Sequence, residues 1–182
     1  MTIGMPFNGL CLHGPDAELE RKGNESFKNS FQAIVVSPQR LPQFPSWGDP
    51  AMSTILLALL DDVCGKFRID GKRIFVSGLN EGAVGAWRMA LQSPDRLAAL
   101  LPVMMQGKFS PPEDAGETLA TLPIWSFMPA GDTADMQALD AMFKESGADW
   151  KLTGVAESDA DPTARPFQQA QLYEWLLGHH RE

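Results

Sequence analysis

The chain has 182 residues, of which 44% are hydrophobic and 21% are charged, and its formal net charge is −8. A chain of this length buries a full hydrophobic core but is short for two domains, so we expect one domain over residues 1–182. The negative charge and the scattered basic residues argue against nucleic acid or an anionic membrane as a partner. No apolar run suggests membrane insertion and no export signal is visible, so a cytoplasmic location is expected.

Short apolar runs alternate with longer amphipathic segments, which is typical of a parallel sheet flanked by helices. The pattern predicts strands at residues 33–37, 73–77, 98–104, 123–128 and 150–155. It predicts helices at residues 52–67, 82–91, 134–144 and 167–177. A Pro- and Gly-containing segment, residues 106–116, is expected to form a surface loop near the carboxyl edge of the sheet. The expected fold class is therefore α/β, a three-layer sandwich with a mostly parallel sheet of five to six strands.

The most informative motif joins the predicted strand at 73–77 to the helix that follows. It reads Gly78-Leu79-Asn80-Glu81-Gly82, which has the form of a nucleophile elbow with an asparagine in the middle. Such an elbow projects its central side chain above the sheet from a strained turn, and the flanking small residues avoid a clash. A carboxamide has no proton that a neighbouring base could usefully remove, so Asn80 cannot attack a carbonyl as serine or cysteine does.

Short segments elsewhere in the chain are informative through their order and spacing. They are His13-Gly14-Pro15, Ile34-Val35-Val36-Ser37-Pro38-Gln39, Phe67-Arg68-Ile69-Asp70, Arg73-Ile74-Phe75-Val76-Ser77-Gly78-Leu79, Pro94-Asp95-Arg96, Gly131-Asp132-Thr133 and Leu172-Tyr173-Glu174-Trp175-Leu176-Leu177. Together they resemble the α/β-hydrolase superfamily, in its esterase and predicted-peptidase branch. That branch includes phospholipase/carboxylesterase and dienelactone-hydrolase-like proteins. The resemblance covers nearly the whole chain and implies carboxylic ester hydrolysis by a Ser-His-acid triad.

The departures from this pattern matter more than the matches. The resemblance places Asn80 at the nucleophile position, Asp132 at the position of the triad acid, and the backbone N–H of Glu81 in the oxyanion hole. The histidine belongs in the loop before the last helix, at or near Ala160, and residues 156–166 contain no histidine. The nucleophile and its base act as a unit, so loss of both predicts a degenerate triad.

The beginning of the chain allows two alignments with this family. In the preferred one His13-Gly14-Pro15 matches a segment that follows the oxyanion strand, so the central strand that supplies an oxyanion donor is missing and the sheet is truncated on its N-terminal side. In the alternative, residues 9–14 form that strand. A missing strand exposes unpaired backbone groups, so we expect another copy of the chain, a different subunit, or the chain's own first dozen residues to cover them.

Other candidate residues have simpler explanations than catalysis. His179 and His180 follow the last helix, where cationic side chains complement the helix dipole. The side chain of Glu81 is expected to lie in solvent at a helix N-terminus. The acidic residues Glu157, Asp159 and Asp161 alternate in a loop without further ligands, and Cys11 and Cys64 belong to no metal-binding motif, so neither a metal nor a cofactor is expected.

Two functions of different classes remain. The first is a non-catalytic α/β-hydrolase-like protein with a structural or protein-interaction role. The second is an active carboxylic ester hydrolase with a rearranged site around Asp132 and an unidentified base. The residues of the expected site favour the first, because function resides in the site and not in the scaffold.

Overall fold

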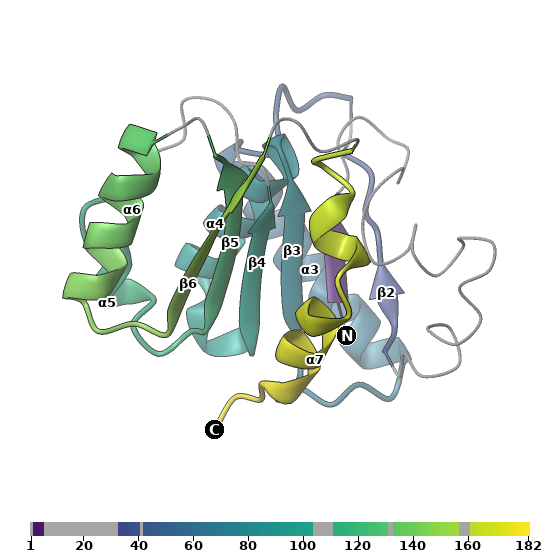
Figure 1. Ribbon diagram of the computed structural model, residues 1–182. Helices are drawn as coiled ribbons and strands as arrows, with labels where there is room; N and C mark the ends of the chain where they lie inside the picture. The colour runs from purple at the N-terminus through teal and green to yellow at the C-terminus, as the bar shows by residue number, and fades with distance from the viewer. Residues whose placement is uncertain (1, 6–32, 41, 104–110, 131–132, 157–160) are drawn as a thin grey trace.

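The computed structural model describes residues 2–5, 33–40, 42–103, 111–130, 133–156 and 161–182. Its centre is a six-stranded sheet with the strand order β2-β1-β3-β4-β5-β6, and every pair of neighbours is parallel (Figure 1). The strands are β1 (Thr2–Met5), β2 (Val35–Val36), β3 (Phe75–Leu79), β4 (Ala99–Val103), β5 (Ile124–Pro129) and β6 (Trp150–Val155). Because all strands are parallel, their carboxyl ends meet at one edge, where α/β folds place their sites.

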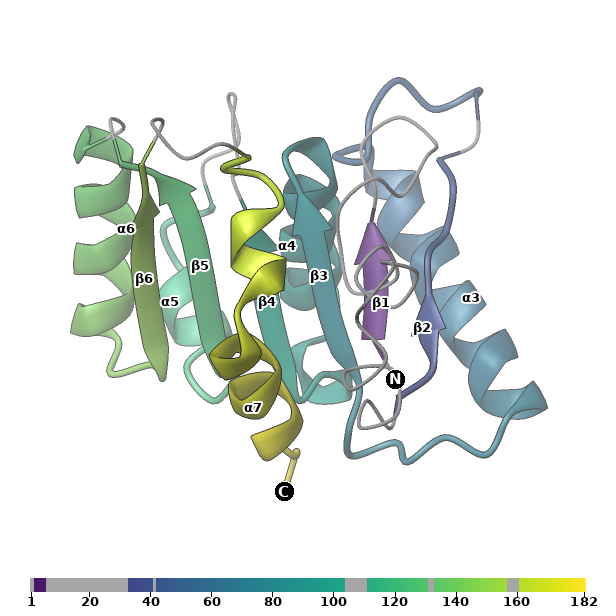
Figure 2. The same ribbon diagram turned by 45° about the vertical axis from the view of Figure 1, so that its right-hand side comes forward.

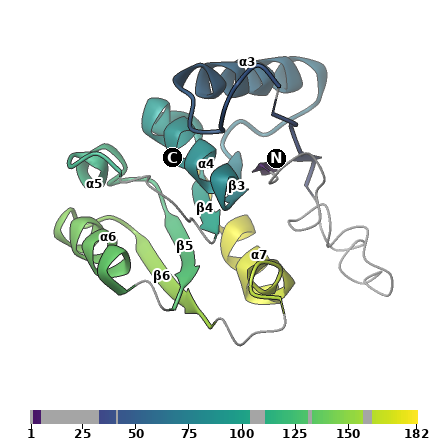
Figure 3. The ribbon, with the colours of Figure 1, turned by 90° about the horizontal axis from the view of Figure 1, so that it is seen from above.

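Helices cover both faces of the sheet and make the expected three layers (Figure 3). One face carries α3 (Pro50–Lys66), α4 (Glu81–Gln92), α5 (Ala115–Thr118) and α6 (Thr133–Glu145), and the other carries α7 (Ala170–Gly178). Two short 3₁₀ helices, η1 (Pro94–Arg96) and η2 (Arg165–Gln168), precede β4 and α7. None of the described helices is both long and apolar enough to cross a membrane.

The core has two main parts because both faces of the sheet are covered. Along β5, Ile124 and Met128 pack into the cluster beneath α3, α4 and α6, whereas Trp125 and Phe127 pack into the cluster beneath α7. Strands buried on both faces read as continuous apolar runs, and this explains why the segments at 98–104 and 123–128 predicted strands so clearly. The predicted bounds of β6 agree with the structure residue for residue.

The beginning of the chain differs from the expectation. The preferred alignment left the central strand out, but Thr2–Met5 forms β1, which lies between β2 and β3 and pairs with both. The expected gap is therefore filled by the chain's own first residues, one of the three possibilities considered, so the expected loss of this strand is wrong. His13-Gly14-Pro15, on which the preferred alignment rests, lies outside the described residues. The alternative strand at 9–14 lies outside the described residues. The predicted strand at 33–37 shortens to Val35–Val36.

Two other predicted segments are divided differently in the structure. The helix expected at 167–177 is interrupted by the extended residue Gln169 (φ −88°, ψ 118°), which separates η2 from α7. The hydroxyl of Tyr173 donates a hydrogen bond of 2.7 Å to the carbonyl of Phe167 and holds the two pieces together. The loop expected at 106–116 ends earlier, because Ala115 and Gly116 begin α5 and are buried.

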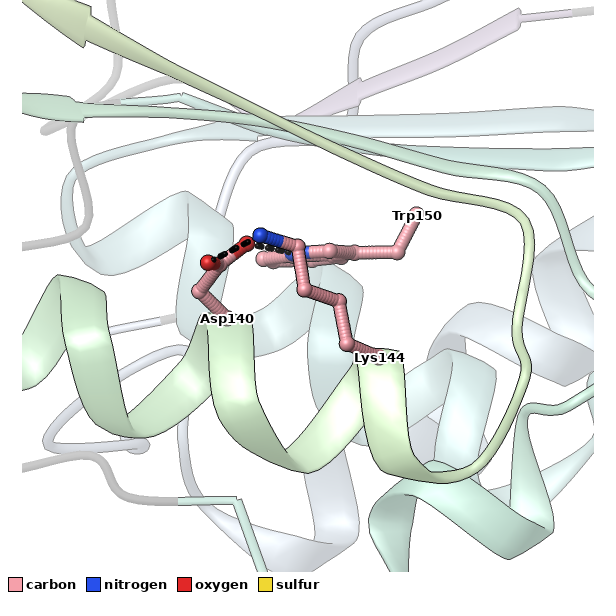
Figure 4. Close-up of polar contacts among 3 residues, drawn as sticks. All are labelled: Asp140, Lys144 and Trp150. Carbon is pink, nitrogen blue, oxygen red and sulfur yellow. Dashed lines mark hydrogen bonds and ion pairs between the residues drawn. The ribbon is translucent and has the colours of Figure 1, made fainter.

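Polar contacts of Asp140 link helix α6 to the edge strand β6 (Figure 4). The carboxylate of Asp140 accepts hydrogen bonds from Lys144 Nζ at 2.6 Å and from Trp150 Nε1 at 3.2 Å. The ring of Trp150 stacks on Phe143 with 4.6 Å between centroids. The hydrogen bond from Lys144 lowers the pKa of Asp140 below its ordinary value, and the Trp150 bond adds to this, while partial burial opposes both.

We expect the contribution of Asp140 to stability to depend on pH in one direction. Because its pKa is lower in the folded chain than in the unfolded chain, the carboxylate stabilises the fold above about pH 4 and the benefit is lost as the pH falls through the folded value. Urea unfolding of the wild type and of Asp140→Asn should therefore show a difference in free energy that is constant near neutral pH and shrinks on acidification. Lys144→Met should weaken this pH dependence, because it removes the largest cause of the shift. A difference that grows on acidification would contradict the assignment.

Candidate active site

The turn between β3 and α4 has the backbone geometry of a strained elbow. Asn80, at its centre, has φ 53° and ψ −116°, and it is the only residue other than glycine with a positive φ among the described residues. Such a conformation costs about 1–3 kcal/mol and persists only where the surrounding structure imposes it. The predicted strand–turn–helix is therefore present, with Asn80 at its apex.

The close contact between β3 and α4 imposes this strain. A Cβ atom on Gly78 would lie 2.0 Å from the carbonyl oxygen of Gly82 and 2.6 Å from the backbone nitrogen of Ala83, so only glycine fits there. The backbone N–H of Asn80 donates a hydrogen bond of 3.0 Å to the backbone carbonyl of Val103 at the end of β4. No local pattern marks Val103, so this link was not foreseen from the sequence.

The side chain of Asn80 is half-buried and makes no capping hydrogen bond to α4. Glu81 is the first residue of α4, and its backbone N–H belongs to the first turn, whose N–H groups have no partner within the helix. Such a donor can bind a negatively charged oxygen, but the neighbouring carboxamide has no nucleophilic form. Ser77 is no substitute, because it is buried in β3 with 1% of its surface exposed.

Two of the expected site residues lie outside the part of the chain that the structure describes. Asp132 follows β5, which ends at Pro129, and Ala160 follows β6, which ends at Val155. Both strands end at the same edge of the sheet as β3, so the topology is compatible with the expected site. The roles of Asp132 and Ala160, and those of Asn80 and Glu81, stay predictions.

The end of the chain, which carries His179 and His180, lies at the opposite edge of the sheet (Figure 2). His179 Nδ1 is 2.7 Å from the carbonyl oxygen of Trp175, and its Nε2 is 3.5 Å from Asp149, the residue before β6. Next to His180, the amide of Arg181 donates to the carbonyl of Lys72, which precedes β3. The five residues of β3 separate the two edges by about 15 Å. Neither His179 nor His180 can therefore reach Asn80 as a base.

Solved structures with a similar fold include esterases and a serine hydrolase. A thermostable esterase superposes with a TM-score of 0.76 at 18% identity, over 99% of this chain and 54% of its own. SOBER1 from Arabidopsis thaliana gives a TM-score of 0.64 at 13% identity, over 96% of each chain. The substrate-bound fluorophosphonate-binding serine hydrolase FphF from Staphylococcus aureus gives 0.67 at 13% identity, over 97% of this chain and 83% of its own.

These likenesses establish the fold of the chain, which is that of the α/β-hydrolases. The chain spans about half the length of the thermostable esterase and nearly the full length of SOBER1. No protein-family model matches the sequence, and no curated protein matches it closely enough to count as a relative. The identities are too low to transfer activity, so the function depends on the residues of the elbow and its surroundings.

The strain at the elbow predicts a stabilising substitution. Asn80→Gly should raise the free energy of unfolding by about 1 kcal/mol, because glycine adopts this conformation without steric cost. Asn80→Ala is the matched control, since it keeps the Cβ atom and should not stabilise the protein. Urea unfolding followed by circular dichroism measures both. If Asn80→Gly destabilised the protein more than Asn80→Ala, interactions of the side chain and not strain would dominate at this position.

Proposed function

We propose that the protein is a non-catalytic α/β-hydrolase-like protein with a structural or protein-interaction role. The observation that carries the proposal is Asn80 itself, which occupies the apex of a strained elbow with a side chain that cannot serve as a nucleophile. A cytoplasmic location accompanies the proposal, since the thiol of Cys64 is free and fits a reducing compartment.

The position of the described histidines and the sequence that follows β1 support the proposal. His179 and His180 are held at the far edge of the sheet, and the loop around Ala160 contains no histidine. Strand β1 ends at Met5 beside Gly78, which is where the family places the strand that supplies an oxyanion donor. The next residue in the sequence is Pro6, which has no backbone N–H to donate. The elbow thus carries asparagine, the two described histidines lie at the far edge of the sheet, and the residue after β1 offers no N–H donor. The third histidine, His13, lies outside the described residues.

The alternative is an active carboxylic ester hydrolase with a rearranged site. Two observations favour it: the elbow keeps its strained geometry, and similar folds occur in esterases and serine hydrolases. Asp132 would then act with a base that the resemblance does not identify. The two proposals differ in whether any hydroxyl of the protein is activated, and a covalent probe can decide between them.

We expect no esterase activity above background. Turnover of short p-nitrophenyl esters should be at least about 10⁴-fold below that of a triad enzyme, because an oxyanion pocket and binding alone retain only a small remnant of the acceleration. A fluorophosphonate, which reacts with an activated serine, should leave the protein unlabelled by intact-mass analysis. Stoichiometric labelling of any serine would overturn the non-catalytic proposal and support the ester hydrolase.

A pair of variants tests whether the lost positions are assigned correctly. Asn80→Ser alone should stay inactive, because no described histidine lies near the elbow. Asn80→Ser combined with Ala160→His supplies both a nucleophile and a base, with Asp132 to orient the imidazole, and should react detectably with the fluorophosphonate. Efficient turnover by Asn80→Ser alone would show that another base exists and that the loop around Ala160 is the wrong place for it.

We further propose that a second chain covers the outer edge of β2. This strand pairs with β1 on one side and with no strand on the other among the described residues. The adjacent Ile34 is a large hydrophobic residue that exposes 40% of its surface. Edges of this kind expose backbone N–H and C=O groups that pair readily with another chain.

We therefore expect the purified protein to sediment as a dimer or larger species at low micromolar concentration. Ile34→Lys should shift it to the monomer, because a charged side chain at a sheet edge opposes strand pairing. Phe67→Lys is the matched control, since Phe67 is the other large hydrophobic residue exposed among the described residues, at 54%, and it follows α3 and not the edge strand. A monomeric wild type whose β2 amides are strongly protected from exchange would rule the interaction out.

A further inference from the structure

A pocket of about 520 Å³ opens at the amino-terminal edge of the sheet, opposite the elbow. Its walls come from three separate segments: the residues before β4, the residues before β5, and the end of the chain after α7. Leu97 and Ala98 are buried and contribute apolar surface. The volume falls within the range of small-molecule sites, about 300–1,000 Å³.

Charged side chains of both signs line this pocket. Arg181 contributes a guanidinium, and Asp95 and Glu182 contribute carboxylates. Within the described part of the chain, none of these three side chains is engaged in a hydrogen bond or ion pair. Arg96, the neighbour of Asp95, is instead engaged outside the pocket, where it binds Asp61 at 2.6 Å.

The backbone around the pocket is held in place independently of these side chains. The amide of Arg181 donates 2.8 Å to the carbonyl of Lys72, and Arg73 Nη2 donates 2.8 Å to the carbonyl of Leu177 at the end of α7. On the opposite wall, the amide of Ala98 donates 2.7 Å to the carbonyl of Ile74. The backbone of Arg181 and that of Ala98 are therefore anchored to the residues that flank β3, whereas the side chains of Asp95 and Glu182 are exposed.

We propose that this pocket binds a small zwitterionic molecule of the amino-acid type. Its carboxylate would pair with the guanidinium of Arg181, which offers a planar set of donors suited to a carboxylate. Its ammonium group would pair with Asp95 or Glu182, and a short aliphatic body would contact Leu97. A ligand with both charges can pair with groups of both signs, whereas a ligand with one charge makes only one of these contacts.

The site is separate from the elbow and does not depend on the proposed function. It lies at the other edge of the sheet, so a ligand bound there cannot contact Asn80. Binding at this pocket is therefore possible for either a non-catalytic protein or an ester hydrolase. Its test needs no measurement of hydrolysis, and its failure would say nothing about the elbow.

Nuclear magnetic resonance of the full chain, with L-leucine as the probe, tests the proposal. The backbone amides of Leu97, Ala98 and Thr121 should shift saturably with a dissociation constant of about 1 mM or below. Two analogues supply controls on the ligand: 4-methylpentanoate lacks the ammonium group and 3-methylbutylamine lacks the carboxylate. Each should bind at least about tenfold more weakly than leucine, because one charged contact is lost. Absence of saturable shifts, or equal binding of the three compounds, would overturn the proposal.

A pair of variants places the binding at Arg181. Arg181→Gln should weaken leucine binding at least about tenfold and leave the thermal midpoint unchanged, because its backbone bond to Lys72 is retained. Arg68→Gln is the matched control: Arg68 is an exposed arginine on the connection from α3 to β3, outside the pocket, and its loss should not affect binding. Unchanged binding by Arg181→Gln, or an equal loss in both variants, would show that leucine does not bind here.

Discussion

The architecture depends on the direct contact between the end of β3 and the first turn of α4. With no Cβ on Gly78, the carbonyl of Gly82 approaches to a distance that excludes any other residue. This contact turns the chain sharply at Asn80 and starts α4 at once, so the helix lies across β3 and β4. Trp87 is thereby placed beside Phe143 and Trp150, and the same core reaches α6 and β6. A looser turn would separate α4 from the sheet and open this core.

The strained conformation at Asn80 is maintained by packing and does not require catalysis. The surrounding glycines and the hydrogen bond to Val103 determine the backbone path whichever side chain lies at the apex. With ψ −116°, Asn80 lies outside the left-handed α region in which asparagine is common, so the backbone is strained for asparagine as for other residues with a Cβ atom. Retention of the elbow is therefore compatible with a scaffold that has lost its nucleophile. Strain alone is not a sign of activity.

A parallel sheet gives the molecule two chemically distinct edges. The carboxyl edge holds the elbow and the expected positions of the triad, whereas the amino edge holds the end of the chain with His179, His180 and Arg181. The length of the strands keeps the imidazoles of His179 and His180, at the amino edge, away from the elbow at the carboxyl edge. This separation excludes His179 and His180 as bases for the elbow, and the residues that follow α7 complete an independent pocket at the amino edge.

The sequence by itself determined the class of the fold, most of the strands and helices, and the elbow. Apolar runs mark β4, β5 and β6, and Gly78 and Gly82 mark the turn. The start of α3 is also decided locally, because the side chain of Asp49 accepts a hydrogen bond from the backbone amide of Ala51. Only the tertiary structure placed β1 in the middle of the sheet. Its four residues carry no pattern of their own and are stabilised by pairing with β2 and β3. Likewise, the distance between His179 and Asn80 depends on which edge α7 reaches, and long-range packing decides that.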